Sequence, residues 1–196
     1  MYSKKLVEIR LHGRGGQGAV LSATLAAEVA FRMGYYPQAF PLFGAERRGA
    51  PVIAFLRYSR SFLMPRCHIY EPDCVVVFDP ELPGEPLWEG LKKKEGIMLV
   101  NAANRHISRF KERGDGGLYT VDASRIAASA GLVSSGMPLV GSVMLGALVK
   151  ILGLAPFHVL EECLQGKISQ LEKNLLAAGR GYHEVKEVKN EDAISG

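Results

Sequence analysis

The chain has 196 residues, of which 47% are hydrophobic and 22% are charged, and its formal net charge is +4. This length and apolar content are sized for one globular α/β domain with a substantial core. The basic excess is small, and its lysines and arginines are dispersed apart from Lys92–Lys94. Such a distribution disfavours nucleic acid as a partner.

Cysteine usage and apolar runs bear on the compartment. Cys67, Cys74 and Cys163 occur without a C-x-x-C pair, so they predict neither a disulfide framework nor a four-cysteine cluster. The N-terminus has no signal-peptide core, and the longest apolar run, 137–149, is shorter than the ~20 residues that span a bilayer. We expect a cytoplasmic protein that does not enter the membrane.

The first predicted elements are a strand, a glycine-rich turn and a helix. Residues 6–11 form a short apolar run of β type, and 19–33 contain no proline and place apolar side chains on one helical face. Between them, Gly13, Gly15 and Gly18 satisfy the pattern G-x-G-x-x-G. Glycines in this context allow backbone N–H groups to approach an anion at a helix N-terminus, and a purely structural turn is the alternative. The candidate residues for binding phosphate or carboxylate are Gly13, Arg14, Gly15, Gly16, Gln17 and Gly18.

A dinucleotide site would need an acidic residue about 20 residues further on, at the end of the second strand, to hold a ribose hydroxyl. Residues 35–41 contain no carboxylate, so NAD is not expected as a ligand. The next acid, Glu46, lies in the loop 41–51 beside Arg47 and Arg48. Guanidinium groups bind phosphate or carboxylate bidentately, so these three residues form a second candidate segment for ligand or subunit contact. A solvated loop is the alternative.

The rest of the chain alternates predicted strands with segments long enough for helices. Strands are expected at 35–40, 52–58, 73–78, 96–101 and 118–122, with a short returning strand at 61–64. Helices are expected at 87–95, 124–130 and 141–152, followed by an amphipathic pair across 159–175. This order predicts a Rossmann-like, doubly wound α/β fold with a mostly parallel sheet and helices on both faces. Residues 1–182 would form a single domain, and 183–196 a polar tail that is disordered or lies on a partner.

Three other groups of residues resemble parts of functional sites, but the sequence predicts neither a catalytic residue nor a metal site. Gly-Asp-Gly at 114–116 begins like a thiamine diphosphate motif, but residues 135–150 lack the asparagine that the motif needs, so a plain turn is favoured. Cys67 and His68 are sequence neighbours whose side chains would diverge on a strand. His12 could face an anion at the glycine turn, although a histidine that ends a strand is more often hydrogen-bonded locally.

Several segments together carry a resemblance to a known family. They are GRGGQGAV at 13–20, QAFP at 38–41, FGAERRGAP at 43–51, PDCVVV at 72–77, GSVMLGAL at 141–148 and RGY at 180–182. In this order they resemble the γ subunit of 2-oxoacid:ferredoxin oxidoreductases, most closely the pyruvate and ketoisovalerate branch. The resemblance spans nearly the whole chain, and its two ordered loops make it specific.

The resemblance implies a subunit of an enzyme that oxidatively decarboxylates a 2-oxoacid, joins the acyl group to coenzyme A and reduces ferredoxin. It implies that thiamine diphosphate, Mg and iron–sulfur clusters are held by other subunits, while this subunit contributes to coenzyme A binding and assembly. The implied partners are the catalytic and ferredoxin-like subunits and ferredoxin, and a homodimer is one option for the isolated chain. The competing interpretation is a stand-alone Rossmann-like nucleotide-binding module or an NAD(P)-dependent reductase.

Overall fold

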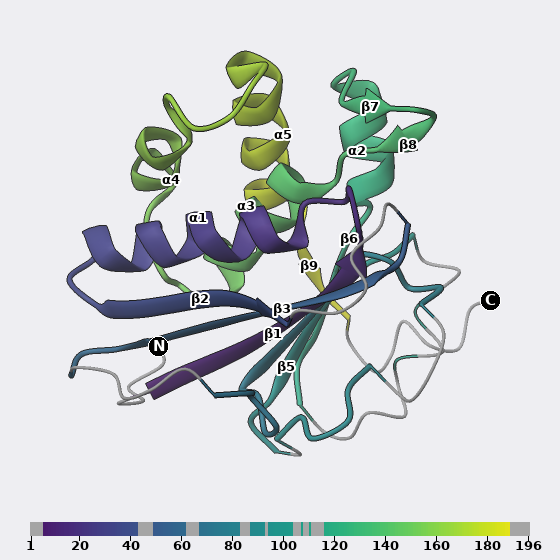
Figure 1. Cartoon of the computed structure of the whole chain (residues 1–196). Coiled ribbons are helices and arrows are strands. Elements are labelled where there is room, and N and C mark those ends of the chain that lie inside the picture. The colour runs from purple at the N-terminus through teal and green to yellow at the C-terminus, as the bar shows by residue number, and fades with distance from the viewer. Residues whose placement is uncertain are drawn as a thin grey trace.

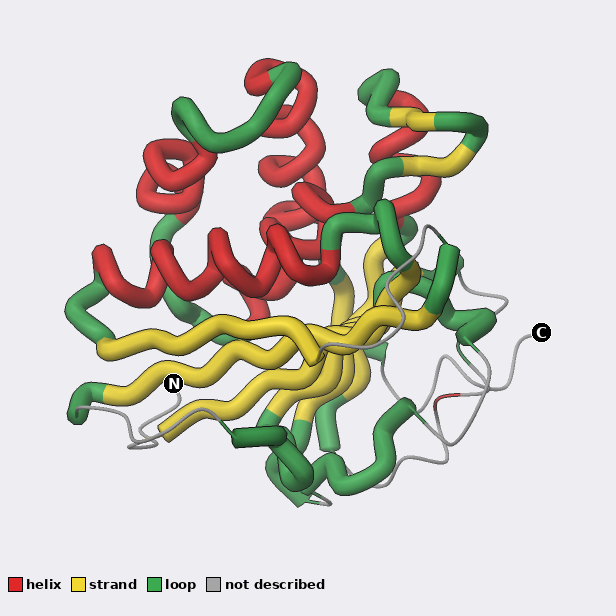
Figure 2. The backbone as a smooth tube through the Cα atoms, in the orientation of Figure 1, coloured by secondary structure: helices red, strands yellow, loops and turns green. Residues whose placement is uncertain are grey.

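A mixed sheet of seven strands forms the centre of the fold (Figure 1, Figure 2). The computed structural model describes residues 6–42, 49–61, 67–82, 87–92, 94–103, 107, 110 and 116–188. The strands of this sheet are β1 (Leu6–Arg14), β2 (Tyr36–Leu42), β3 (Pro51–Ser59), β4 (Cys74–Val77), β5 (Ile97–Asn101), β6 (Leu118–Val121) and β9 (Lys186–Glu187). A separate hairpin pairs β7 (Val133–Ser134) with β8 (Met137–Pro138). The helices are α1 (Ala19–Arg32), α2 (Ala123–Ser129), α3 (Gly141–Ile151), α4 (Phe157–Leu164) and α5 (Leu171–Glu184).

The strand order is β2-β3-β1-β4-β5-β6-β9. Strands β1, β4, β5 and β6 are parallel neighbours, whereas β3 pairs antiparallel with β1 and β2, and β9 pairs antiparallel with β6. Because two antiparallel steps restore the direction, β2 runs with β1, and five of the seven strands point the same way. The predicted α/β fold with a mostly parallel sheet is confirmed.

The five described helices pack on one face of the sheet (Figure 1). They meet inward side chains of the central strands, including Ile9, Leu11 and Val76, which are fully buried. Strand β4 is buried along its whole length, as expected for the middle of a parallel sheet. Helix α3 is also buried over most of its length, so it forms the centre of the helical layer.

Loop segments cover the opposite face in the part of the chain that the structure describes. The apolar side chains of these loop segments pack against β4, β5 and β6. These side chains belong to Leu82, Leu87, Leu91, Ala102 and Phe110. The prediction of a helix at 87–95 is wrong, because residues 87–90 form turns and Gly90 has a φ of +72°. A Cβ on Gly90 would lie 2.0 Å from the carbonyl oxygen of Tyr70, so this turn can approach its neighbour only without a side chain. On this face, loop residues therefore supply the apolar cover that was expected from helices.

Helices α3 and α5 cross with their backbones in close contact. A Cβ on Gly146 of α3 would lie 2.0 Å from the carbonyl oxygen of Ala178 in α5. A Cβ on Gly181 of α5 would lie 2.0 Å from the carbonyl oxygen of Val143 in α3. No carbon atom fits at such a distance, so the crossing requires glycine at both positions. The predicted pair of C-terminal helices is confirmed as α4 and α5, with Gly166 between them.

The C-terminal residues extend the fold beyond the predicted domain boundary. Helix α5 continues to Glu184, and β9 then pairs with β6 at the edge of the sheet. Arg125 and Arg180 both donate to the Glu184 carboxylate, at 2.9 Å and 2.6 Å. The first residues of the predicted tail are therefore part of the sheet and its last helix. Other parts of the sequence predictions lie outside the described residues, namely 62–64, 114–115 and 189–196.

Candidate functional site

The glycine turn joins the carboxyl end of β1 to the N-terminus of α1, beside the carboxyl end of the parallel strand β4. Strand β1 extends two residues into the motif, so the turn itself comprises residues 15–18. Gly16 and Gly18 have φ values of 96° and 92°, in the left-handed region that favours glycine. A Cβ on Gly13 would lie 3.2 Å from the Cβ of Phe78, so glycine also allows close packing below the turn.

No side chain caps the N-terminus of α1. The first helical hydrogen bond runs from the Ser22 N–H to the Gly18 carbonyl at 2.8 Å. The N–H groups of residues 19–21 therefore have no partner within the helix, and the helix dipole adds about half a positive charge there. The Gln17 side chain turns back and accepts from the Arg14 N–H at 2.8 Å, which fixes the shape of the turn. Backbone donors and positive potential at this end of α1 suit an anion.

Hydrogen bonds join the glycine turn to the end of the second candidate segment. The Gly15 N–H donates to the Ala50 carbonyl at 2.9 Å, and the Gly49 N–H donates to the Gly15 carbonyl at 3.1 Å. Gly49 directly follows Arg48 in the sequence. The structure therefore brings the glycine turn and the residues that follow the arginine pair together, which sequence alone did not show. Glu46, Arg47 and Arg48 themselves lie outside the described residues.

The Arg14 guanidinium contacts protein groups on three sides. Its Nε forms an ion pair with Asp79 at 2.5 Å, Nη2 donates to the Glu81 carbonyl at 3.2 Å, and Nη1 donates to the Gly49 carbonyl at 3.4 Å. These contacts link the glycine turn to the loop that follows β4. Sequence reasoning placed Arg14 among the anion-binding residues. In this structure the contacts of Arg14 position the neighbouring loops.

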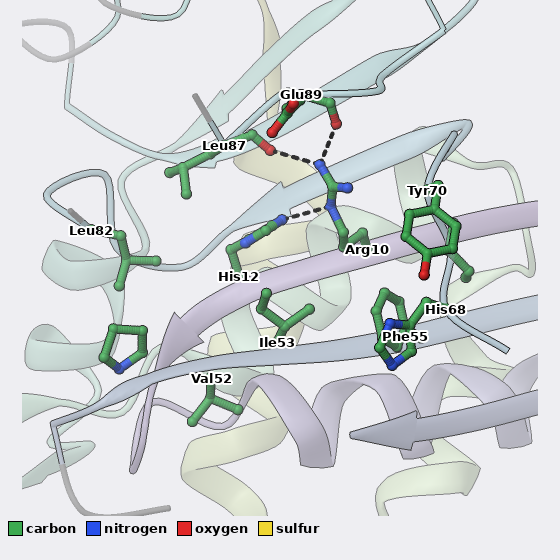
Figure 3. Close-up of a pocket in the computed structure, with 12 residues that line it drawn as sticks. Arg10, His12, Val52, Ile53, Phe55, His68, Tyr70, Leu82, Leu87 and Glu89 are labelled. Carbon is green, nitrogen blue, oxygen red and sulfur yellow. Dashed lines mark hydrogen bonds between the residues drawn. The ribbon is translucent and has the colours of Figure 1, made fainter. Parts of the chain in front are cut away.

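His12 lies one residue before the glycine motif and is only 8% exposed. The Arg10 Nε donates to the His12 Nε2 at 2.8 Å (Figure 3). Because a guanidinium can only donate, Nε2 must accept, and the ring proton must sit on Nδ1. Burial, helped by the nearby Arg10 charge, lowers the pKa of His12 to about 3, so the ring is neutral at pH 7. Sequence reasoning missed Arg10, although its place two residues before His12 on the same strand face is a usable signal.

Acidification is expected to destabilise the chain through His12. The unfolded histidine takes up a proton near pH 6.5, whereas the folded one does so only at about pH 3. This contribution to stability is complete above the unfolded pKa and is lost progressively as the pH falls from about 6.5 to about 3. From pH 7 to pH 5 the loss should be about 2 kcal/mol. Urea unfolding at both pH values, for the parent chain and for His12→Gln, measures it, because the glutamine oxygen can still accept from Arg10. An identical pH dependence of the two proteins contradicts the prediction.

Among the described residues, no group of three or more His, Cys, Asp or Glu is arranged to hold a metal ion. The three cysteines are free thiols. Cys67 lies beside Arg57, with its Sγ 3.5 Å from Nη1, while the neighbouring His68 ring stacks on Phe55. The two side chains thus meet different partners, although residues 67–69 do not form the strand on which they were expected to diverge. None of the helices in the described ranges has the combination of length and apolar character needed to cross a bilayer.

These features define a Rossmann-like α/β domain with a glycine turn and a helix N-terminus at the carboxyl ends of parallel strands. The chain belongs to the pyruvate ferredoxin/flavodoxin oxidoreductase family, whose model matches residues 8–184. It is 41% identical over 189 residues to the pyruvate synthase subunit PorC of Methanothermobacter thermautotrophicus, covering 94% of this chain and 98% of that protein. It is 43% identical over 182 residues to the pyruvate/ketoisovalerate oxidoreductases common subunit gamma of Pyrococcus furiosus, covering 90% and 96%.

Solved structures agree with this family membership. The pyruvate oxidoreductase subunit PORC of Thermotoga maritima superposes with a TM-score of 0.79 at 37% identity, covering 95% of this chain and 100% of that chain. A 2-oxoglutarate:ferredoxin oxidoreductase from Magnetococcus marinus, solved with 2-oxoglutarate, coenzyme A and succinyl-CoA bound, matches at a TM-score of 0.68 and 23% identity. The match covers 91% of this chain and 31% of that chain, and at this identity it shows the shared fold. The resemblance carried by the two loops is confirmed.

Proposed function

We propose that this chain is the γ subunit of a multi-subunit pyruvate:ferredoxin oxidoreductase, and that the glycine turn with Glu46, Arg47 and Arg48 contributes to coenzyme A binding and assembly. The complex oxidatively decarboxylates the 2-oxoacid to acyl-CoA and reduces ferredoxin. Thiamine diphosphate, Mg and the iron–sulfur clusters belong, in this proposal, to the catalytic and ferredoxin-like partner subunits. The free cysteines of this chain fit the reducing cytoplasm in which we place the complex.

One observation carries the assignment of coenzyme A to this face. The hydrogen bonds between Gly15 and residues 49–50 bring the uncapped N-terminus of α1 close to the chain that directly follows the arginine pair. A helix N-terminus and guanidinium groups both bind phosphate oxygens, and coenzyme A carries a diphosphate and a further phosphate. A helix N-terminus held beside the residues that follow an arginine pair therefore suits this co-substrate better than a glycine turn alone would.

The strand order disfavours the competing interpretation as an NAD(P)-dependent reductase. In the dinucleotide-binding fold, the strand after the first helix lies directly beside the first strand and ends in the acid that holds the ribose. Here β3 separates β2 from β1, and β2 contains no carboxylate. The crossover through α1 therefore ends one strand too far away to place such an acid at the glycine turn.

The isolated chain is expected to be inactive with pyruvate, coenzyme A and a ferredoxin or viologen acceptor, because the proposal places the cofactors on partner subunits. Activity should appear when the catalytic and ferredoxin-like subunits are added. Steady-state assays of the separate and recombined chains test this, and analytical ultracentrifugation shows whether the isolated chain forms a homodimer. Turnover by the purified single chain refutes the subunit assignment.

Replacing Arg47 or Arg48 by alanine is expected to weaken coenzyme A binding in the assembled complex. A lost charge-assisted contact costs about 1.5–3 kcal/mol, or roughly 10- to 150-fold in affinity. The apparent KM for coenzyme A should rise while the subunits still assemble. If these arginines bridge to a catalytic subunit instead, the complex should loosen in a salt-dependent way and the KM should stay normal. Normal assembly and a normal KM in both single variants and the double variant contradict both roles.

A further inference from the structure

A pocket of about 320 Å³ lies on the sheet face opposite the helices (Figure 3). Strands β1 and β3 form its floor, and residues 68–70 together with Leu82, Leu87 and Glu89 form its sides. In the register of these strands, Arg10 lies opposite Phe55 and His12 lies opposite Ile53, so the four side chains share one face. The volume is at the small end of ligand pockets, which fits a single ring system better than a whole cofactor.

The polar side chains that line this pocket are Arg10, His12, His68, Tyr70 and Glu89. Of these, Arg10 and His12 lie on the floor and can still donate hydrogen bonds. Arg10 Nη2 donates to the carbonyls of Leu87 at 3.3 Å and Glu89 at 2.5 Å, and its Nε is used by His12. Nη1 of Arg10 and Nδ1–H of His12 have no partner among the described residues. His12 is more than nine-tenths buried, so its unused donor is already held in place. The pocket thus offers donors to a ligand that brings hydrogen-bond acceptors.

Aromatic rings form one wall of the pocket. The Phe55 and His68 rings are stacked, with centroids 5.5 Å apart and an interplanar angle of 25°. The ring of Tyr70 follows, 6.0 Å from His68, and is 74% exposed at the rim. Aliphatic side chains such as Ile53 and Leu87 complete the lining. Ring faces and aliphatic walls favour a flat, uncharged group over a bare anion.

We propose that this pocket binds the purine ring of an adenine nucleotide. A purine combines a flat apolar face, which packs on aromatic rings, with ring nitrogens that accept the hydrogen bonds offered by Arg10 and His12. A phenyl group from a partner protein would fill the same space but leave both donors unpaired, at a cost in binding. The nucleotide is either the adenosine end of coenzyme A or a free adenine nucleotide. For coenzyme A the inference rests on the proposed function, whereas a free nucleotide is independent of it.

The test uses the full chain with AMP, coenzyme A and pantetheine, which lacks the nucleotide, as probes in calorimetry and competition experiments. Ile53→Trp should fill the pocket and weaken AMP binding 10-fold or more. Phe55→Leu keeps apolar bulk but removes a ring face, and should weaken AMP binding roughly 2- to 12-fold. Leu176→Trp is the matched control, because Leu176 is 58% exposed on α5, outside the pocket lining. Thermal unfolding of each variant establishes that it is folded.

In the first outcome, AMP competes with coenzyme A for the parent chain but not for Ile53→Trp, and pantetheine does not compete with AMP. This result supports the pocket, with coenzyme A as the source of the bound adenine. In the second outcome, Ile53→Trp weakens AMP binding and coenzyme A does not bind. This result supports the pocket, with a free nucleotide as the source of the bound adenine. If AMP does not bind, or binds equally to Ile53→Trp and the parent chain, the inference is overturned. That result leaves the proposed function standing as long as Arg47 and Arg48 variants still raise the KM for coenzyme A in the complex.

Discussion

Gly181→Ala should lower the melting temperature of the chain by about 6–12 °C, because the added Cβ collides with backbone at the α3–α5 crossing. That Cβ would lie 2.0 Å from the Val143 carbonyl oxygen, and a carbonyl cannot rotate away as a side chain can. The helices must move apart, which opens contacts of the fully buried Val143 and Met144. The expected cost is about 3 kcal/mol or more, a large share of the 5–15 kcal/mol that stabilises a typical domain.

Gly179→Ala is the matched control, two residues earlier in the same helix. Its Cβ would lie 3.2 Å from Cζ of Phe157, the tip of a ring that can shift by a few tenths of an ångström. Alanine also favours a helix over glycine by up to about 1 kcal/mol. We expect a melting temperature close to that of the parent chain in thermal unfolding followed by circular dichroism. Equal melting temperatures for the two variants would show that the helices can separate at little cost.

Gly18→Val should reduce the activity of the assembled complex about 100-fold, the scale of loss for a displacement of about 1 Å at a binding element. Gly18 has a φ of 92°, which a β-branched residue adopts only with strain. Its Cβ would also lie 3.1 Å from Cα of Gly141, where the N-termini of α1 and α3 meet. The turn must therefore move away from the position that presents its backbone donors.

Gly34→Val separates this local effect from general strain. Gly34 also has a positive φ, 77°, and follows α1 at its other end, with only Nη1 of Arg60 within 3.4 Å of its Cβ position. The Gly34→Val chain should lose stability in a similar way, but the complex that contains it should keep the parent rate and the parent KM for coenzyme A. Rate assays on complexes assembled from each variant decide the matter. Full rate and unchanged coenzyme A dependence in Gly18→Val would reduce the glycine motif to a structural turn.

The secondary structure was largely predictable because it depends on local patterns. The predicted helices at 19–33 and 141–152 end within one residue of α1 and α3. The predicted strand 73–78 contains β4, whose complete burial follows from its uninterrupted apolar side chains. Segment 87–95 was the exception, because its apolar residues pack as a loop whose path depends on Gly90 fitting against Tyr70. That contact joins residues about twenty positions apart and leaves no periodic signal.

The candidate site was predictable in part. The glycine pattern located the turn at 15–18 and the helix N-terminus, because a tight turn needs glycine at fixed positions. The use of each side chain was not predictable. Arg14 was predicted to bind an anion, and the structure adds contacts of its guanidinium with Asp79, Glu81 and Gly49 that no sequence pattern indicated. The pairing of Arg10 with His12 was also missed, because burial of the pair depends on segments from other parts of the chain.

Most strands and helices, the glycine turn and the family resemblance could be inferred from the sequence alone, since all three are recorded in local residue order. The strand order, in which antiparallel β3 lies between β1 and β2, became visible only in the three-dimensional structure, as did the addition of β9 to the sheet edge. The three-dimensional structure also shows that Gly15 bonds to residues 49–50 and that Arg10 and His12 line a pocket. Strand neighbours and buried polar pairs are selected by packing between segments distant in sequence, and a single sequence contains no periodicity that specifies them.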